Sequence, residues 1–245
     1  MKKHLLLLLF VLPCWGIAQE TEIWRIGGQL GFQGNKSALI GGDRTADSRF
    51  EQKNAGAAGL NIYARYDYNQ HWMLLTGLGI SSYGFEFSFS QNYSLLNPES
   101  RRQVVKNDIG LIEIPFLIHY KFNPSCTQVR WVIGAGFIQN LQTEVKTGGT
   151  YVPGNESSLG LSYFTSEVQL GKSLFPTFRF TVGKEKMLKA GDILSIGMLF
   201  NYGFAYNAKT TVKYAVDGKS YVHQYGNNGN FVGLRAAYYF APVKK

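Results

Sequence analysis

The feature that most constrains this chain is a series of segments, each about ten residues long, in which apolar and polar side chains alternate. In the first segment Trp24, Ile26 and Leu30 share one face, and Arg25 and Gln29 share the other. Successive side chains of a strand point to opposite faces of a sheet, so the pattern predicts β-strands. Because about 9–11 residues take a tilted strand across a bilayer, the segments predict a transmembrane β-barrel.

We expect an all-β fold, an antiparallel up-and-down barrel of about eight strands. The expected strands cover residues 23–33, 59–68, 72–89, 109–122, 130–140, 178–185, 194–204 and 232–240. Ten strands are the alternative, if residues 161–170 form a separate strand of the barrel. The alternation changes phase near Ser82, which predicts either a bulge there or a strand end beyond the bilayer.

Short and long connections alternate along the chain. The short ones cover residues 69–71, 123–127 and 186–191, and the long, polar ones cover residues 34–57, 90–107, 143–162 and 207–229. Short turns of bacterial barrels face the periplasm and long loops face outward. We therefore expect both termini in the periplasm and four mobile loops outside the cell.

The first eighteen residues predict a cleaved signal peptide: a positively charged start, an apolar run over 5–12 and small residues at 16–18. The barrel domain then covers 19–245. Cleavage removes Cys14 and leaves only Cys126, which excludes an internal disulfide and a metal site built on cysteines. Charged residues make up 17% of the chain, fewer than in most soluble domains. Together these features predict the outer membrane of a Gram-negative bacterium.

Charged residues gather on the face opposite the apolar one. They are Arg25, Arg65, Asp67, Glu113, Lys121, Arg130, Arg179, Glu185 and Arg235. Both signs are present, so ion pairs can fill an eight-strand barrel, whose interior is just wide enough for side chains. We expect a structural network in the lumen rather than an open diffusion pore.

Aromatic residues cluster near the expected short turns and the C-terminal end. They are Tyr66, Tyr68, Trp72, Tyr120, Phe122, Trp131, Tyr238 and Phe240. Such residues form a girdle where a barrel meets the membrane–water interface.

Two segments carry a family resemblance. Residues 112–122 read Ile-Glu-Ile-Pro-Phe-Leu-Ile-His-Tyr-Lys-Phe, which resembles a recurrent strand of the PorT-like outer-membrane β-barrel family of Bacteroidota. Residues 233–240 resemble that family's closing strand, with its aromatic signal for the barrel-insertion machinery, although residues 241–245 extend past the signal. The resemblance implies an eight-stranded barrel without enzymatic activity and, through the family's namesake, a role in type IX protein secretion.

Two other functions stay open: a small porin-like conduit for solutes, and an outer-membrane enzyme with a site on its loops. His71, His119 and His223 fall on a short turn, the lumen face and an outer loop, so they do not converge on a metal. An enzyme would rely on His223, with Asp217 and Ser220 nearby. We predict no enzymatic activity, no cofactor and no metal.

The formal net charge is +9, and many cations fall in the long connections. For an exported protein we expect no nucleic-acid partner. We expect contact with outer-membrane lipid, and with the anionic sugars and phosphates of lipopolysaccharide, unless these cations only face solvent. The cations are Arg44, Arg49, Arg101, Arg102, Lys106, Lys209, Lys213 and Lys219.

Overall fold

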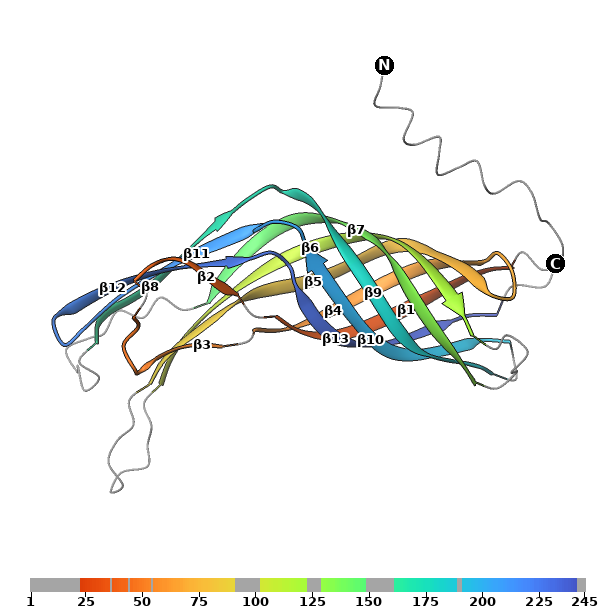
Figure 1. Ribbon diagram of the computed structural model, residues 1–245, viewed down its shortest axis with the longest axis horizontal. Helices are drawn as coiled ribbons and strands as arrows, with labels where there is room; N and C mark the ends of the chain where they lie inside the picture. Colours follow the sequence, from red (N-terminus) through yellow and green to blue (C-terminus); the bar gives the residue numbers. More distant parts are fainter. Residues whose placement is uncertain are drawn as a thin grey trace, which may run out of the picture.

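The computed structural model describes residues 23–35, 37–43, 45–53, 55–90, 102–122, 129–148, 161–188 and 191–241, and they form strands and connections without a helix (Figure 1). The strands are β1 (Ile23–Asn35), β2 (Ala38–Gly42), β3 (Phe50–Lys53), β4 (Ala55–Asp67), β5 (Trp72–Ser90), β6 (Arg102–Lys121), β7 (Val129–Gly148), β8 (Leu161–Leu170), β9 (Leu174–Met187), β10 (Ile193–Gly203), β11 (Ala208–Val216), β12 (Lys219–Asn227) and β13 (Phe231–Tyr239). In the described ranges no helix is long and apolar enough to span a membrane. The expected signal peptide, the turn at 123–127, Arg44 and Arg101 lie outside the described residues.

Eight strands close into a barrel, in the order β1, β4, β5, β6, β7, β9, β10 and β13. Neighbours are antiparallel throughout, and β13 closes the ring because it pairs with both β1 and β10. Closure gives backbone groups of the wall a partner inside the protein, as a bilayer requires. The predicted eight-strand antiparallel barrel is confirmed.

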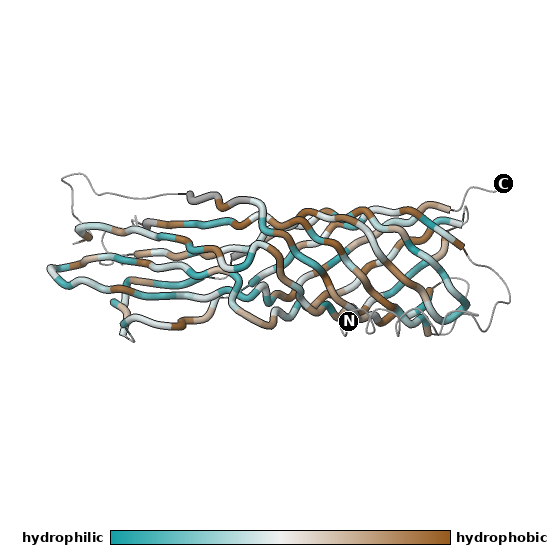
Figure 2. Tube along the Cα trace, turned by 90° about the horizontal axis from the view of Figure 1, so that it is seen from above, coloured by the Kyte–Doolittle hydropathy of each residue, from teal (hydrophilic) through white to brown (hydrophobic). Residues whose placement is uncertain are grey.

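The outer wall of the barrel is mostly apolar, and the charged side chains predicted for the lumen point inward. Phe32 is 67% exposed and Leu234 is 62% exposed, whereas Arg65 is fully buried. Figure 2 shows hydrophobic residues concentrated along the barrel half of the molecule. The alternation in the sequence therefore separates a lipid-facing side from a lumen side.

The turn between β4 and β5, the first residues of β1 and the last residues of β13 lie at one end of the barrel, here named the turn end (Figure 1). Aromatic rings of the predicted girdle pack there along the outside of the wall in tilted and edge-to-face pairs. Trp24 and Tyr66 have ring centroids 4.6 Å apart, and Tyr120 lies 5.0 Å from both Trp72 and Phe122.

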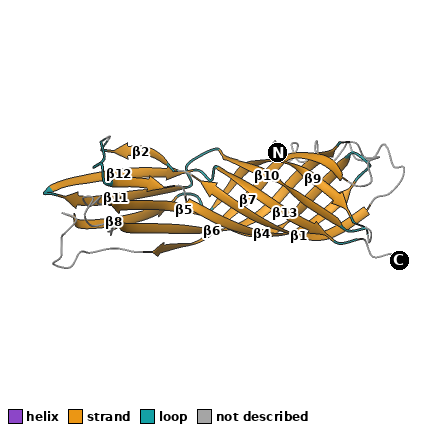
Figure 3. Cartoon of the chain, turned by 90° about the horizontal axis from the view of Figure 1, so that it is seen from below, coloured by secondary structure: helices purple, strands orange, loops and turns teal. Residues whose placement is uncertain are grey.

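Residues 161–170 do form a strand, β8, but it is not part of the barrel, so the ten-strand alternative is wrong. β8 pairs with β11 in a separate four-stranded sheet of order β2-β12-β11-β8 (Figure 3). Leu161 and Phe164 of β8 are buried in an apolar core together with residues of β5 and β11.

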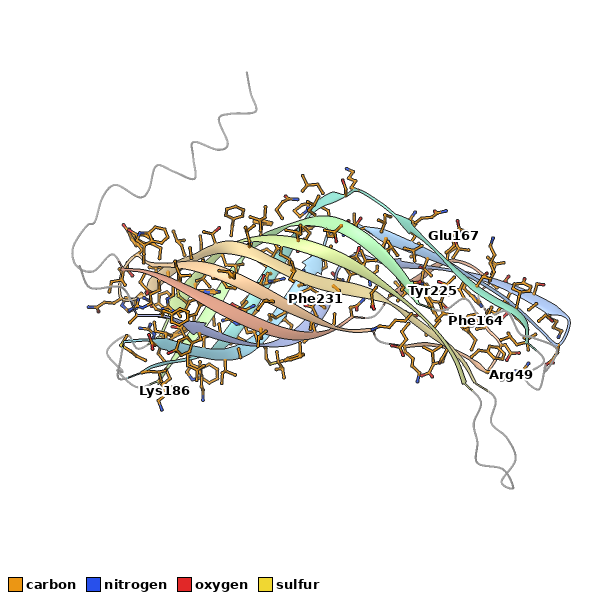
Figure 4. All side chains as sticks on the ribbon, turned by 180° about the vertical axis from the view of Figure 1, so that it is seen from behind. Arg49, Phe164, Glu167, Lys186, Tyr225 and Phe231 are labelled. Carbon is orange, nitrogen blue, oxygen red and sulfur yellow. The ribbon has the colours of Figure 1, made fainter. Side chains whose placement is uncertain are left out.

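The four-stranded sheet packs against β3 and the far ends of β5, β6 and β7, and together they form a sandwich here named the head (Figures 1 and 3). Its core holds Phe50, Tyr83, Phe85, Phe87, Phe89, Val105, Ile109, Leu111, Leu161, Phe164, Phe175, Ala208, Val212, Tyr214, Val216 and Tyr225. Figure 4 shows Phe164 and Tyr225 in the head, with Lys186 at the opposite end of the molecule.

The expectation of four mobile outer loops is therefore wrong for the described parts of those segments. Phe50, Tyr214 and Tyr225 come from segments whose overall composition is polar, yet each ring is buried in the head core. Burial of large aromatic side chains stabilises each by about 1.5–3 kcal/mol relative to exposure, enough to order a short sheet.

The phase change near Ser82 reflects a change of surroundings and not a bulge in β5. The pairing of β5 with β6 keeps one register from Trp72↔Tyr120 to Ser90↔Arg102. Odd-numbered residues of β5 point inward throughout, from Met73 in the lumen to Phe89 in the head. Beyond Ser82 the same strand leaves the charged lumen, and its inward side chains enter the apolar core of the head. The apolar residues of β5 therefore change from the outward face to the inward face.

The register shift of this region lies between β6 and β7. Ile109 pairs with Val145 and Leu111 pairs with Gln142, so β7 carries one more residue than β6 between these pairs. The extra residue turns Val145 inward, where it packs against the head core. The bulge thus lets β7 direct side chains into the lumen on one side of it and into the head core on the other.

Candidate functional site

The predicted lumen charges form two groups, and the first lies at the turn end. This lower cluster consists of Arg25, Arg65, Asp67, Lys121, Arg130 and Glu185. Arg65 is its centre, with Nη2 2.9 Å from Oδ1 of Asp67 and Nη1 2.7 Å from Oε1 of Glu185. These contacts tie β4 to β9 across the barrel, where the low dielectric strengthens each ion pair.

Asp67 holds two further cations of the lower cluster. Nη1 of Arg25 lies 2.5 Å from its Oδ2, and Nζ of Lys121 lies 3.0 Å from its Oδ1. Arg130 approaches Glu185 more loosely, with 3.3 Å between Nη2 and Oε2. The cluster holds four cations against two carboxylates, so it has an excess of positive charge.

The second group lies further along the lumen toward the head. Nη2 of Arg179 donates to Oε2 of Glu113 over 3.0 Å, and its Nε donates to Asn201 over 3.0 Å. The hydroxyl of Ser81 donates to the other oxygen of Glu113 over 2.6 Å. The pair is buried and hydrogen-bonded, which offsets the cost of its desolvation.

Arg235 joins neither group. It is buried and donates to Oε1 of Gln29 over 3.4 Å, while its Nε and Nη2 have no hydrogen-bond partner among the described residues. Gly31 and Gly197 occupy the paired positions on the neighbouring strands.

An apolar layer also crosses the lumen. Its members are buried and packed together: Tyr63, Leu75, Leu117, Ile138, Ile193, Ala237 and Tyr239. With the two charged groups, this layer places buried side chains at successive levels of the lumen. Such an interior stabilises the wall and hinders the passage of solutes.

His119 occupies space left by a glycine. Its Nε2 lies 2.9 Å from Oγ1 of Thr181 in a hydrogen bond, and the ring is fully buried. A Cβ at Gly134, on the adjacent strand, would lie 1.3 Å from Cδ2 of His119. The imidazole and the glycine therefore depend on each other.

Gly134→Ala is expected to displace His119 and to lower the free energy of unfolding by about 1–3 kcal/mol, the usual cost of overpacking. Gly34→Ala is the matched control, because a Cβ there meets nothing within 4 Å. Denaturant titration in detergent measures both variants. Equal stability of the two variants would contradict the assigned packing.

His223, the residue on which an enzymatic site would rely, lies in the aromatic core of the head. Its Nδ1 is 2.9 Å from the carbonyl oxygen of Asp43, and its Nε2 is 3.1 Å from the hydroxyl of Tyr214. Asp217 lies in the β11–β12 turn and pairs with Arg49 over 2.7 Å. The structure thus does not bring His223 and Asp217 together in a catalytic arrangement.

His71, His119 and His223 lie apart, in the turn end, the lumen and the head. Among the described residues no group of three or more His, Cys, Asp or Glu side chains is placed to hold a metal ion.

The cations predicted for the long connections that lie in the head differ in their surroundings. Lys209, Lys213 and Lys219 are exposed on the hairpin of β11 and β12. Arg49 instead pairs with Asp47 over 2.8 Å, and its hydrogen bonds lower the pKa of that carboxyl group. Burial in the head core raises the pKa of Tyr214 to about 12, so this hydroxyl stays protonated at neutral pH.

The closed wall, the apolar outer surface and the charged lumen define an outer-membrane β-barrel. The model of the family described as "Outer membrane protein beta-barrel domain" matches residues 17–221, and the chain belongs to this family. It is accordingly a protein of the outer membrane. No curated protein matches the chain.

Solved barrels are similar to the chain in outline. The outer membrane protein OprG from Pseudomonas aeruginosa is 12% identical, with 91% of this chain and 98% of that chain covered and a TM-score of 0.46. The outer membrane protein AlkL is 16% identical, with 94% and 96% covered and a TM-score of 0.37. Ail of Yersinia pestis is 11% identical, with 88% and 99% covered and a TM-score of 0.29.

Proposed function

We propose that the protein is a non-enzymatic interaction barrel that holds a folded head outside the cell, with both termini in the periplasm. The observation that carries the proposal is the buried aromatic core of the head, formed by segments that a simple pore needs only as loops. The filled lumen supports anchoring rather than transport. The expected orientation follows from the short turns at one end and the long excursions at the other.

The partner we propose is a protein assembly of the outer membrane, with type IX secretion as the first candidate. Support comes from the PorT-like segment at residues 112–122, which forms the barrel part of β6 up to Lys121. Strand β13 carries the closing signal for the barrel-insertion machinery during biogenesis. Lipopolysaccharide is a second proposed partner, in contact with the exposed Lys209, Lys213 and Lys219.

An affinity pull-down from detergent-solubilised outer membranes, followed by mass spectrometry, tests this function. We expect stoichiometric secretion or assembly components with the wild-type protein, and their loss when Phe87→Ala loosens the head. A Leu39→Ala control alters a half-exposed head residue and should keep the partners. A wild-type barrel that purifies without any partner would contradict the proposal.

A further inference from the structure

A cavity of about 150 Å³ lies at the turn end of the barrel. Its wall includes Arg25, Lys121 and Arg130 together with a single carboxylate, that of Asp67. Gln70 and Met187 on its rim are exposed to solvent. Because the head core and the apolar layer close the barrel above it, the cavity is a pocket with its entrance at the turn end.

The donors around the cavity exceed the acceptors that the described residues supply. Arg25 is 7% exposed, and its Nε has no hydrogen-bond partner in the described structure. Nζ of Lys121 donates to Asp67 and to the carbonyl oxygen of Asn69. The third hydrogen of this ammonium group has no acceptor in these two bonds and is available to a ligand. The 3.3 Å contact of Arg130 with Glu185 is long for a charge-assisted hydrogen bond.

The excess positive charge of the lower cluster also favours an anion in the cavity. The lower cluster contains four cations and two carboxylates, so two positive charges are not neutralised within it, and excess buried charge is costly. Guanidinium and ammonium groups that converge on a small cavity match the oxygens of phosphate and carboxylate groups. The cavity is several times larger than the roughly 10–15 Å³ that one water molecule needs, so it has room for one small oxoanion.

We propose that this cavity is a binding site for one small oxoanion, a phosphate or carboxylate group, held by Arg25, Lys121 and Arg130. The site is independent of the head and of the interaction function proposed above. The anion neutralises the excess charge of the lower cluster and occupies the free hydrogen-bond donors.

Isothermal titration calorimetry of the full-length mature protein, in neutral detergent at low ionic strength, tests the site with inorganic phosphate and, separately, acetate. Binding of phosphate alone identifies a phosphate site, and binding of acetate identifies a carboxylate site. Arg130→Gln is expected to weaken the binding at least tenfold. Lys184→Gln is the matched control and should stay within twofold, since Lys184 lies outside the wall over the ring of Trp131.

Gln70→Glu provides a second variant, because it adds a carboxylate at the rim without removing a contact of the fold, and it should weaken binding by a similar factor. Glu20 and Glu22 precede Ile23 in the sequence, so a Glu20→Gln/Glu22→Gln variant is also titrated. Equal or tighter binding by this variant supports the proposal. Binding of neither probe to the wild type, or unchanged binding in both Arg130→Gln and Gln70→Glu, would overturn it.

Discussion

Arg65→Met is expected to lower the free energy of unfolding of the barrel by about 3–5 kcal/mol, the largest effect we anticipate in the lumen. Arg65 is fully buried and contacts both carboxylates of the lower cluster. Methionine fills part of the space but leaves Glu185 with only the long contact to Arg130. A buried charge that loses its main partner keeps its desolvation cost without the compensating attraction.

Denaturant titration of the purified barrel in detergent, followed by tryptophan fluorescence, measures this change. Lys106→Met is the control, because the Lys106–Asp108 pair has side chains that are 44% and 39% exposed. Exposed ion pairs contribute about 0–1 kcal/mol, so this variant should unfold almost as the wild type does. A loss below about 1 kcal/mol for Arg65→Met would contradict a stabilising network around Arg65.

Phe87→Ala is expected to destabilise the head by about 3–5 kcal/mol while the barrel stays closed. Phe87 is fully buried, and its ring centroid lies 4.9 Å from that of Tyr225 across the two sheets of the head. Its removal leaves a cavity between the sheets. Hydrogen–deuterium exchange should therefore speed up in β11 and β12, with little change in β1 and β13.

The comparison is made with Leu39→Ala, which removes a half-exposed apolar side chain from the same head. That variant should leave the exchange of β11 and β12 close to the wild-type rate. Uniform loss of protection in head and barrel together, or none in either, would show that the head is not the separate packed unit described above.

The barrel itself could be predicted from the sequence because the bilayer imposes a two-residue period on each strand. Trp24 and Ile26 had to face lipid if Arg25 faced the lumen, and the structure places them so. The partners within the lumen could not be predicted in the same way. Whether Glu185 pairs with Arg65 or with Arg179 depends on the stagger of the strands around the barrel. The alternation within a single strand carries no information about this stagger.

The head escaped prediction because its strands belong to an ordinary soluble sandwich. In β11 the buried Val212 and Tyr214 alternate with the exposed Lys209 and Lys213. The average composition of this segment is therefore polar, as expected of a loop. The run Tyr83, Phe85, Phe87 and Phe89 was the available signal, because aromatic residues at inward positions need an apolar core. His223 likewise lies at a buried position of an alternating strand, β12, and packs in the core of the head.

The proposed function is that this barrel anchors a folded head without conducting. Single-channel recording of the purified protein in a planar bilayer tests it most directly. We predict no steady conductance above that of the bare bilayer, because two charged groups and an apolar layer fill the lumen. Stable openings whose size changes when Arg179, the partner of Glu113, is replaced by methionine would contradict the account and assign the lumen to transport.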